Sequence, residues 1–388
     1  MSRGVRLAFV TSRYPPHTGG VETHVAELAE RFARAGHDVV VHTADRAPLA
    51  VGSGAEDERG DADANGPPAP PRERRNGVLV RRHRGLAPGG AFHVAPGIAP
   101  AIRRADVDLV HAHNYHSLPV LFAALGTAGR DVPLVVTPHY HGGSASGLRD
   151  RLLAAYRPLG RWALRRADAV VAVSDWERGR LAADFGVDAR VIPNGLDVER
   201  FDAARETVDA GRGPPNPPRP YLLSVGRVEA YKGVQHVVRA LEDLPEYDLV
   251  VAGSGPYLDD LRSLARAADV ADRVDFRGYV PDDHLPGLYA GAAAFVTMST
   301  FEAYGMTVAE ALAAGTPCVV RPAGALVDWT DRADCVAADP DDLPTAVREA
   351  VGLDAPAEPL PTWDDVVDRV ADVYADVLGL SRDAVGTP

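Results

Sequence analysis

Lysine is almost absent from this sequence, and cysteines and long apolar runs are scarce. Lys232 is the one lysine among 41 basic residues in a chain of 388. Cys318 and Cys335 lack the Cys-x-x-Cys spacing of zinc and redox motifs, which predicts buried thiols in a reducing compartment. No run approaches 18 apolar residues, and the apolar N-terminal segment is shorter than a secretory signal. We therefore expect a cytoplasmic protein that is at most peripheral to the inner membrane face.

The sequence also lacks a basic charge balance. Its formal net charge is −13, whereas general nucleic-acid binding needs a basic face, so no nucleic-acid partner is expected. A chain rich in Ala, Val, Asp and Arg but nearly free of lysine resembles proteins of salt-loving (halophilic) archaea, whose acidic surfaces keep them soluble. With 46% hydrophobic residues the chain suits two domains, because single cores stop growing at about 250–300 residues.

Short apolar runs alternate with helical patterns along the whole chain, which predicts an α/β protein with parallel sheets covered on both faces. The predicted strands of the first half are Val5–Thr11, Val39–Thr43, Gly77–Arg82, Asp108–His113, Leu134–Thr137, Ala169–Val173 and Arg190–Pro193. Those of the second half are Tyr221–Val225, Asp248–Ala252, Arg273–Phe276, Ala294–Thr297 and Pro317–Val320.

Two breaks in this alternation suggest the domain limits. Residues 46–77 have no apolar periodicity and predict a mobile loop within an N-terminal domain, 1–202. Residues 203–220 contain Gly-Pro-Pro-Asn-Pro-Pro and predict an interdomain linker, followed by a second domain, 221–362. The segment 363–380 is amphipathic and predicts a closing helix. Two similar domains with a Pro-rich joint suggest a cleft enzyme that binds its ligand at the carboxyl ends of the strands.

The strongest group of candidate site residues lies between Ser299 and Pro317. A predicted strand leads into Ser299, a loop follows, and a helix begins near residue 307. Unpaired amides and the helix dipole would make the loop a binding site for an anion. The loop amides are those of Ala303, Tyr304, Gly305 and Met306. Glu302 and Glu310 are placed to accept hydrogen bonds from sugar hydroxyls, although a glutamate at a helix start often only caps the helix.

Lys232 lies in a second candidate segment, Gly226-Arg227-Val228-Glu229-Ala230-Tyr231-Lys232-Gly233. Lysine carries a compact point charge on a flexible stem, whereas arginine carries a flat fork. A compact cation five residues after Arg227 and between glycines suits a diphosphate. Drift explains the position of a single lysine equally well until the neighbouring motifs are considered.

Together these segments make the chain resemble glycosyltransferase family 4, a group of retaining enzymes with the two-domain GT-B fold. The Glu-x7-Glu motif of Glu302 and Glu310 carries the resemblance, which extends over nearly the whole chain. Further matching landmarks are Gly226-Arg227 with Lys232-Gly233, Gly253-Ser254-Gly255-Pro256, Val274–Gly278 and Ile192–Asp197. The resemblance implies two Rossmann-like, doubly wound domains that face a central cleft. The second would bind a nucleotide-sugar donor, the first the acceptor, and the closing helix would cross back to the first domain.

The resemblance also implies roles for single residues of the second domain. Arg227 and Lys232 would bind the donor diphosphate, where positive charge stabilises the leaving nucleoside diphosphate. Glu302 would hold the donor sugar, and Glu310 the ribose. The backbone near Arg277 would border the base.

In the first domain the resemblance points to a glycine pair and a histidine. Gly19 and Gly20, at a helix start, look like the family's glycine loop beside the donor phosphate. His139 occupies the place of the family's histidine at a strand end and would hydrogen-bond the donor sugar or the developing charge. The alternative is that His139 is only a packed residue, as most histidines at strand ends are.

Several histidines and aspartates raise the question of a metal. The histidines are His111, His113, His116, His139 and His141. Alternate residues on a strand share a face, but no nearby carboxylate or cysteine completes a tetrahedral set. Of two Asp-x-Asp pairs, Asp61/Asp63 lies in the low-complexity loop and Asp106/Asp108 begins a strand. We therefore expect no obligatory metal and no other cofactor.

Residues 148–166 form a basic segment with six arginines and one aspartate. A basic amphipathic helix lies on an anionic membrane in some proteins, which would fit a lipid-linked acceptor. An ordinary surface helix beside an acidic neighbour explains the same charges.

The predicted function is transfer of a hexose from a UDP- or GDP-sugar to a hydroxyl acceptor, with retention of the anomeric configuration. The acceptors considered include a lipid-linked one and a cell-surface glycan. One alternative is a sugar-nucleotide epimerase or hydrolase of the same fold, which would release nucleotide without an acceptor. Another is a non-catalytic sugar-nucleotide-binding subunit, against which the intact charged set argues. The segment Arg321–Trp329 departs from the family's usual small-residue loop, which affects the donor sugar more than the reaction.

Overall fold

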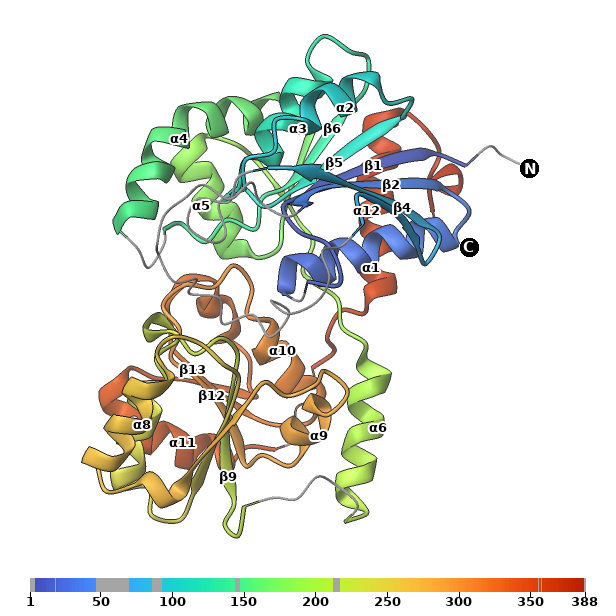
Figure 1. Cartoon of the computed structure of the whole chain (residues 1–388). Helices are drawn as coiled ribbons and strands as arrows, with labels where there is room; N and C mark the ends of the chain where they lie inside the picture. Colours follow the sequence, from blue (N-terminus) through green and yellow to red (C-terminus); the bar gives the residue numbers. More distant parts are fainter. Residues whose placement is uncertain are drawn as a thin grey trace. The chain divides into compact units, whose positions relative to one another are not determined.

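The chain forms two compact α/β units (Figure 1). The computed structural model describes residues 4–17, 19–46, 70–85, 93–143, 147–211, 217–354, 356 and 358–386. Within these ranges, residues 4–195 and 363–386 belong to the first unit and residues 196–362 to the second. Most of the predicted mobile loop, 47–69, lies outside the described residues.

The first unit is built on an eight-stranded sheet in the order β3-β4-β2-β1-β5-β6-β7-β8. All neighbours are parallel except β3, which runs antiparallel to β4. The strands are β1 (Arg6–Thr11), β2 (Asp38–Arg46), β3 (Arg72–Arg75), β4 (Val78–Arg84), β5 (Leu109–His113), β6 (Leu134–Thr137), β7 (Ala169–Ala172) and β8 (Arg190–Val191). The helices are α1 (Gly20–Arg34), α2 (Ile98–Arg104), α3 (Pro119–Thr127), α4 (Gly147–Arg166), α5 (Asp175–Phe185) and α12 (Trp363–Leu378).

Alternate side chains of β1 enter two different apolar layers. Leu7 and Phe9 pack with α1 and α12, whereas Ala8 and Val10 pack with the helices α2 to α5. Figure 1 shows α2 and α3 on one face of the sheet and α1 and α12 on the other. Because both faces are covered, strands of this unit have continuous apolar runs rather than alternating polarity.

Helix α12 follows the second unit in the chain but packs in the first. Its apolar side joins the cluster that contains β1 and α1. The Tyr374 hydroxyl lies 2.6 Å from Nδ1 of His111, and its ring stacks on Phe32. The end of the chain is thereby tied to the centre of the first sheet.

The second unit is a six-stranded, fully parallel sheet in the order β11-β10-β9-β12-β13-β14. Its strands are β9 (Tyr221–Val225), β10 (Asp248–Ala252), β11 (Val274–Gly278), β12 (Ala294–Thr297), β13 (Cys318–Val320) and β14 (Cys335–Ala337). Its helices are α6 (Val198–Asp209), α7 (Val234–Ala240), α8 (Leu258–Ala267), α9 (Leu285–Ala290), α10 (Met306–Ala313) and α11 (Leu343–Val351). Two doubly wound parallel units confirm the predicted α/β class.

Three elements differ from the sequence-based expectation. The segment predicted as a mobile loop, 46–77, contains β3, which pairs with β4 through the turn Asn76-Gly77. Both turn residues have positive φ, 47° and 85°, the conformation that an Asn-Gly hairpin turn favours. Helix α6 occupies the first part of the segment predicted as a linker, 203–220. The short edge strand β14 was not predicted.

A buried glutamate fixes the loop after β6. Ser174 caps α5 by accepting a hydrogen bond from the Glu177 amide, which places Glu177 at the third helical position. Its carboxylate, fully buried, accepts hydrogen bonds from the amides of Tyr140 at 2.5 Å and Val173 at 2.7 Å. Burial raises the pKa of Glu177 to about 8, against the effect of these two donors.

We expect Glu177→Gln to destabilise the protein above about pH 8, where Glu177 is ionised and both of its oxygens accept, because the new NH2 group would face a backbone N–H. An unsatisfied buried polar group costs about 1–3 kcal/mol. Urea unfolding measures the change, with Glu242→Gln, at an exposed glutamate, as the matched control. Equal stability of the two variants would contradict the proposed role of Glu177.

Candidate active site

Two loops of the second unit meet at one edge of its sheet. Strands β9 and β12 are parallel neighbours, so their carboxyl ends lie side by side. The loop after β9 carries Arg227 and Lys232, and the loop after β12 carries Glu302. The fold therefore brings together residues about 70 positions apart.

The two loops are in direct contact through their backbones. Residues Ala230–Lys232 form a short 3₁₀ helix that ends at Gly233, where φ is 75°. A side chain at Gly233 would collide with the carbonyl oxygen of Met298, so glycine is needed here for steric as well as conformational reasons. The Thr300 amide donates to the Tyr231 carbonyl at 3.0 Å. These contacts hold the Lys232 segment against the loop that carries Glu302.

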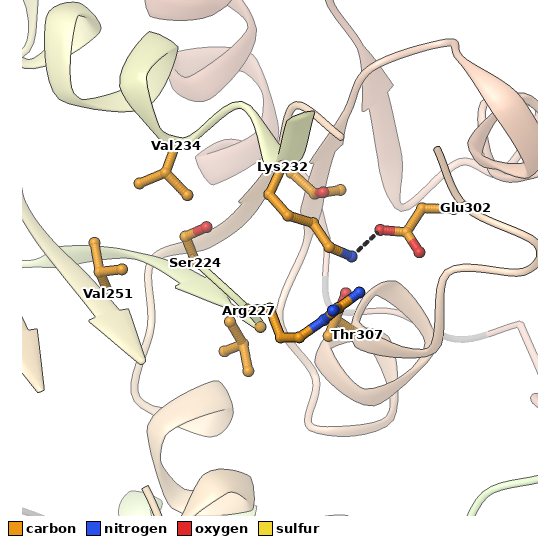
Figure 2. A pocket seen from close by; sticks show the side chains of 10 residues that line it. Ser224, Arg227, Lys232, Val234, Val251, Glu302 and Thr307 are labelled. Atoms are coloured by element: carbon orange, nitrogen blue, oxygen red, sulfur yellow. Dashed lines mark hydrogen bonds and ion pairs between the residues drawn. The ribbon is translucent and has the colours of Figure 1, made fainter. Parts of the chain in front are cut away.

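Lys232 and Glu302 form an ion pair, with Nζ and Oε1 2.6 Å apart (Figure 2). Their side chains are mostly buried, with exposed fractions of 21% and 20%. Burial acts to lower the pKa of Lys232, but the interactions with Glu302 and Tyr231 outweigh it, and the pKa is raised above its ordinary value. Lys232 is therefore a fixed cation at neutral pH.

This ion pair borders a small polar pocket of the second unit. The lining residues are Ser224, Val225, Gly226, Arg227, Lys232, Val234, Val251, Thr297, Glu302 and Thr307. Figure 2 shows the charged ends of Arg227 and Lys232 reaching toward the same side of the pocket. The Arg227 side chain is 68% exposed and pairs with Glu229 at 2.8 Å. The pocket is thus lined by two cations, the mostly buried Lys232 and the exposed Arg227, together with the hydroxyls of Ser224 and Thr307.

Helix α10 begins beside the pocket with a tightly supported turn. Gly305 adopts φ 99°, and Met306 is the first helical residue. The Trp329 indole donates to the Tyr304 carbonyl at 2.6 Å, and its ring packs edge-on against Tyr304. The sequence showed only that the Trp329 segment was unusual. The structure shows that Trp329 holds the turn ahead of α10.

Glu310 lies on α10 but is not among the residues that line the pocket. The Tyr289 hydroxyl donates to its Oε2 at 2.7 Å. Burial raises the pKa of Glu310 to about 7; Tyr289 and Arg200 oppose this shift, and Asp282 adds to it. Glu310 thus changes its charge near neutral pH.

Arg277 lies apart from the pocket that Arg227, Lys232 and Glu302 line. It lies on β11, its Nε donates to Asp275 Oδ2 at 2.8 Å, and it does not line the pocket. At the end of the same strand, the Gly278 carbonyl accepts a hydrogen bond from the Gly253 amide at 2.7 Å. This backbone contact ties the ends of β10 and β11 together.

The remaining candidate site residues lie in the first unit. Gly19 precedes α1, Gly20 is its first residue, and the Thr23 amide donates to the Gly19 carbonyl at 2.9 Å. His139 follows β6, with φ 48° and an exposed fraction of 6%. Burial lowers its pKa well below the usual value, so its imidazole is neutral.

The five histidines considered for a metal differ in their hydrogen-bond partners. The ring centroid of His111 lies 4.1 Å from that of His113, but its two nitrogens are engaged by Tyr374 and Thr137. His116 stacks on His141, with ring centroids 3.7 Å apart, and accepts from the His141 amide. His113 and His139 meet His24 of α1, which the sequence-based argument did not include, and one nitrogen of each of these three rings lies within 4.8 Å of the other two.

The Asp106/Asp108 pair is occupied by an arginine. Arg6 forms ion pairs with both aspartates, and its backbone amide also donates to Asp108, at 2.8 Å. The arginine charge explains the acidic pair without a metal. The other pair, Asp61/Asp63, lies outside the described residues.

The basic segment 148–166 falls in α4, and several of its arginines bind the first unit itself. Arg161 and Arg165 donate to the Phe185 carbonyl, and Arg157 pairs with Asp184. Among the side chains of α4 that the structure describes, Leu152, Leu159 and Trp162 are large, apolar and exposed. In the described part of the chain, no helix combines the length and apolarity required to cross a bilayer.

Two family models together match most of the chain. The model named Glycosyltransferase Family 4 matches residues 18–200, and Glycosyl transferases group 1 matches residues 208–350. The glycogen synthase of Mycobacterium tuberculosis is 31% identical over 379 residues, which cover 91% of this chain and 87% of that protein. The chain belongs to glycosyltransferase family 4.

Two further similarities concern this family 4 glycosyltransferase. A GDP-mannose-dependent alpha-(1-6)-phosphatidylinositol monomannoside mannosyltransferase of Mycolicibacterium smegmatis is 29% identical, over 82% of this chain and 81% of that one. The Anabaena protein HepE, solved with UDP and glucose, superposes with a TM-score of 0.70 at 16% identity, covering 96% of this chain and 99% of that one. At that identity the superposition supports the GT-B fold alone.

Proposed function

We propose that this glycosyltransferase transfers a hexose from a UDP- or GDP-sugar to a hydroxyl group with retention of the anomeric configuration. The observation that carries the proposal is the pocket where Arg227, Lys232 and Glu302 meet. Two proteins named above support this donor class: the M. smegmatis enzyme by its name uses GDP-mannose, and HepE was solved with UDP and glucose and, in another structure, with UDP-glucose.

The proposed donor pose follows from charge. The diphosphate lies against Arg227 and Lys232, because each phosphate carries negative charge that a partly desolvated cation stabilises. Glu302, on the opposite side of the ion pair, accepts hydrogen bonds from hydroxyls of the sugar. In the absence of donor, Lys232 and Glu302 neutralise each other at 2.6 Å. Donor binding exchanges this ion pair for a Lys232–phosphate contact.

The chemical step needs stabilisation of the leaving nucleoside diphosphate. As the bond between the sugar and the phosphate breaks, charge grows on the phosphate oxygen, and Lys232 and Arg227 are positioned to stabilise it. The acceptor hydroxyl attacks from the same face, and the departing phosphate oxygen takes its proton. Glu302 is assigned to the sugar hydroxyls in this pose, so it is not proposed as the nucleophile of a double displacement.

No metal is required in this proposal. The two side-chain cations supply the charge that a divalent ion would otherwise provide. Arg6 already forms ion pairs with both Asp106 and Asp108. A chelator is therefore not expected to lower the transfer rate.

The decisive experiment offers UDP-, GDP- and ADP-sugars to the purified protein in concentrated salt, with and without a hydroxyl acceptor. We expect nucleotide release that depends on the acceptor, and a product with the donor's anomeric configuration by NMR. Equal release without acceptor would indicate a hydrolase or epimerase. Binding without any turnover would indicate a non-catalytic subunit.

Donor binding is expected to depend on pH through Glu310, the proposed ribose ligand. Because the Glu310 pKa is raised to about 7, its carboxylate, the better acceptor, forms as pH rises. KM for the donor should fall across that range. In Tyr289→Phe the hydrogen bond at 2.7 Å is lost and the midpoint should move to higher pH. KM measured across about pH 5–9 tests this, with Glu310→Gln as the variant that should lose the dependence.

The acceptor and the setting of the reaction are also proposals. The M. smegmatis relative acts on a phosphatidylinositol mannoside by its name, which favours a lipid-linked acceptor at the inner membrane face. The exposed Leu152, Leu159 and Trp162 of α4 would provide the contact. The acidic, lysine-poor composition favours a cytoplasm of high salt, as in halophilic archaea. Co-sedimentation with anionic vesicles tests the membrane contact, and Leu159→Asp is expected to weaken it.

A further inference from the structure

Three buried imidazoles meet in the first unit. His113 ends β5, His139 follows the neighbouring strand β6, and His24 projects from α1. Their exposed fractions are 0%, 6% and 2%. The ring centroid of His24 lies 5.5 Å from that of His113 and 4.9 Å from that of His139. One nitrogen of each ring lies within 4.8 Å of the other two.

The nitrogens of this His24–His113–His139 cluster are largely without hydrogen-bond partners. Nε2 of His24, Nε2 of His139 and both nitrogens of His113 are buried and have no partner among the described residues. A buried polar atom without a partner costs about 1–3 kcal/mol, so four such atoms in one place are unusual for a purely structural cluster.

Asn194 orients one of these rings. Its Oδ1 lies 2.8 Å from Nδ1 of His24. An amide oxygen only accepts, so Nδ1 carries the proton and Nε2 presents a lone pair to the cluster. Histidines that bind metals commonly donate their second nitrogen to an oxygen in this manner, which fixes the ring and increases its basicity.

The charge state of the cluster also suits a cation. Burial, reinforced by the other rings, lowers the pKa of His113 and His139 well below the usual value. Burial lowers that of His24 to about 4, against the effect of Asn194. Neutral imidazole is the form that binds a metal.

We propose that His24, His113 and His139 form a three-histidine site for a divalent transition metal of the zinc class. Imidazole ligands select Zn²⁺, Co²⁺, Ni²⁺ or Cu²⁺ over Mg²⁺ or Ca²⁺. Around Zn²⁺, with Zn–N distances of about 2.0–2.1 Å, three nitrogens lie roughly 3.3 Å apart, so the rings need small rotations. Three protein ligands leave a fourth position open. Neither His24 nor Asn194 entered the sequence-based argument against a metal.

Binding at this site would inhibit transfer rather than support it. His139 is also the residue proposed to contact the donor sugar, and a bound metal would occupy its Nε2. This second effect rests on the proposed function, whereas metal binding does not. The two are measured separately, so the failure of one is distinguishable from the failure of the other.

The test uses the full chain, without an affinity tag and after treatment with a chelator. We expect Zn²⁺ to bind with one ion per chain by calorimetry, and Co²⁺ to give the visible absorption of a four-coordinate site. The variants His24→Gln, His113→Gln and His139→Gln should each weaken binding by about tenfold or more, and Asn194→Ala by about 10–100-fold. His116→Gln, at a partly buried histidine outside the cluster, is the matched control and should bind as the wild type does.

Absence of stoichiometric Zn²⁺ binding to the wild-type chain would overturn the proposal. Undiminished binding by the folded cluster variants would also overturn it, as would an equal loss in the His116→Gln control. Circular dichroism establishes which variants fold. If one fails to fold, the wild-type stoichiometry and the remaining variants decide. In the transfer assay, Zn²⁺ is expected to inhibit the wild type and the chelator to restore the rate.

Discussion

Replacement of Lys232 by alanine is expected to lower kcat/KM for the nucleotide-sugar donor by about 10²–10³-fold, as when one group that stabilises transition-state charge is removed. The Lys232 ammonium is the better-buried cation of the pocket, whereas Arg227 is 68% exposed and pairs with Glu229. Arg227 alone is therefore a weak substitute. Steady-state rates at low donor concentration measure the loss.

Lys232→Arg is the informative control, because it keeps the charge but replaces a compact ammonium with a planar fork. The loops around Lys232 are held together by the Gly233–Met298 contact and the Thr300–Tyr231 hydrogen bond, which leave little room for adjustment. We expect the arginine variant to recover only part of the activity. A folded alanine variant with a near-normal kcat/KM would contradict the role of Lys232.

Replacement of Glu302 by glutamine is expected to have a different signature. The kcat/KM for the donor should fall by about 10–100-fold, because a hydrogen bond to a charged group contributes about 1.5–3 kcal/mol. Affinity for the nucleoside diphosphate without sugar should be unchanged or higher. The reason is that the Lys232–Glu302 ion pair, which competes with the phosphate, is lost. Calorimetry with UDP and GDP, beside kinetics with the corresponding sugars, separates the two effects.

Glu229→Gln provides the matched control for Glu302. Glu229 is another glutamate beside the pocket, and it pairs with Arg227 at 2.8 Å, but it is not among the lining residues. This variant should keep at least the wild-type kcat/KM with sugar donors, because it removes only a carboxylate that competes with the phosphate for Arg227. If Glu302→Gln weakened the bare nucleoside diphosphate as much as the sugar donor, Glu302 would have no specific role toward the sugar.

Much of the fold was predictable because the sheets are parallel and covered on both faces. Strands such as β9, β10 and β12 are uninterrupted apolar runs, and the predicted bounds Tyr221–Val225, Asp248–Ala252 and Ala294–Thr297 match the structure. Both neighbouring layers bury these side chains, so the signal in the sequence is strong.

The missed elements derive their stability from contacts rather than from their own composition. Strand β3 has the sequence Arg-Glu-Arg-Arg and exists through pairing with β4. The Asn76-Gly77 pair was the signal that would have predicted it. Helix α6 packs on α9 of the second unit. The prolines that follow it in the sequence predicted a linker, so the helix was missed.

The residues of the candidate sites likewise include some that were predictable from the sequence and some that were not. Lys232 and Glu302 follow apolar strands that are easily recognised, so their meeting at one sheet edge could be inferred from the motif and the fold class. The His24–His113–His139 cluster could not, because it depends on the packing of α1 over the ends of β5 and β6. Trp329 was visible only as a departure from the family pattern, since its role is a single hydrogen bond to the Tyr304 carbonyl.

The central claim is that the second unit recognises the diphosphate of a sugar nucleotide through Lys232. The most direct test compares the affinities of UDP with UMP and of GDP with GMP, in the wild type and in Lys232→Ala. We expect the wild type to bind the diphosphate of its own nucleotide about tenfold or more tightly than the monophosphate. The reason is that a charge-assisted hydrogen bond contributes about 1.5–3 kcal/mol. In Lys232→Ala this difference should largely disappear. An equal preference for the diphosphate in both proteins would contradict the account.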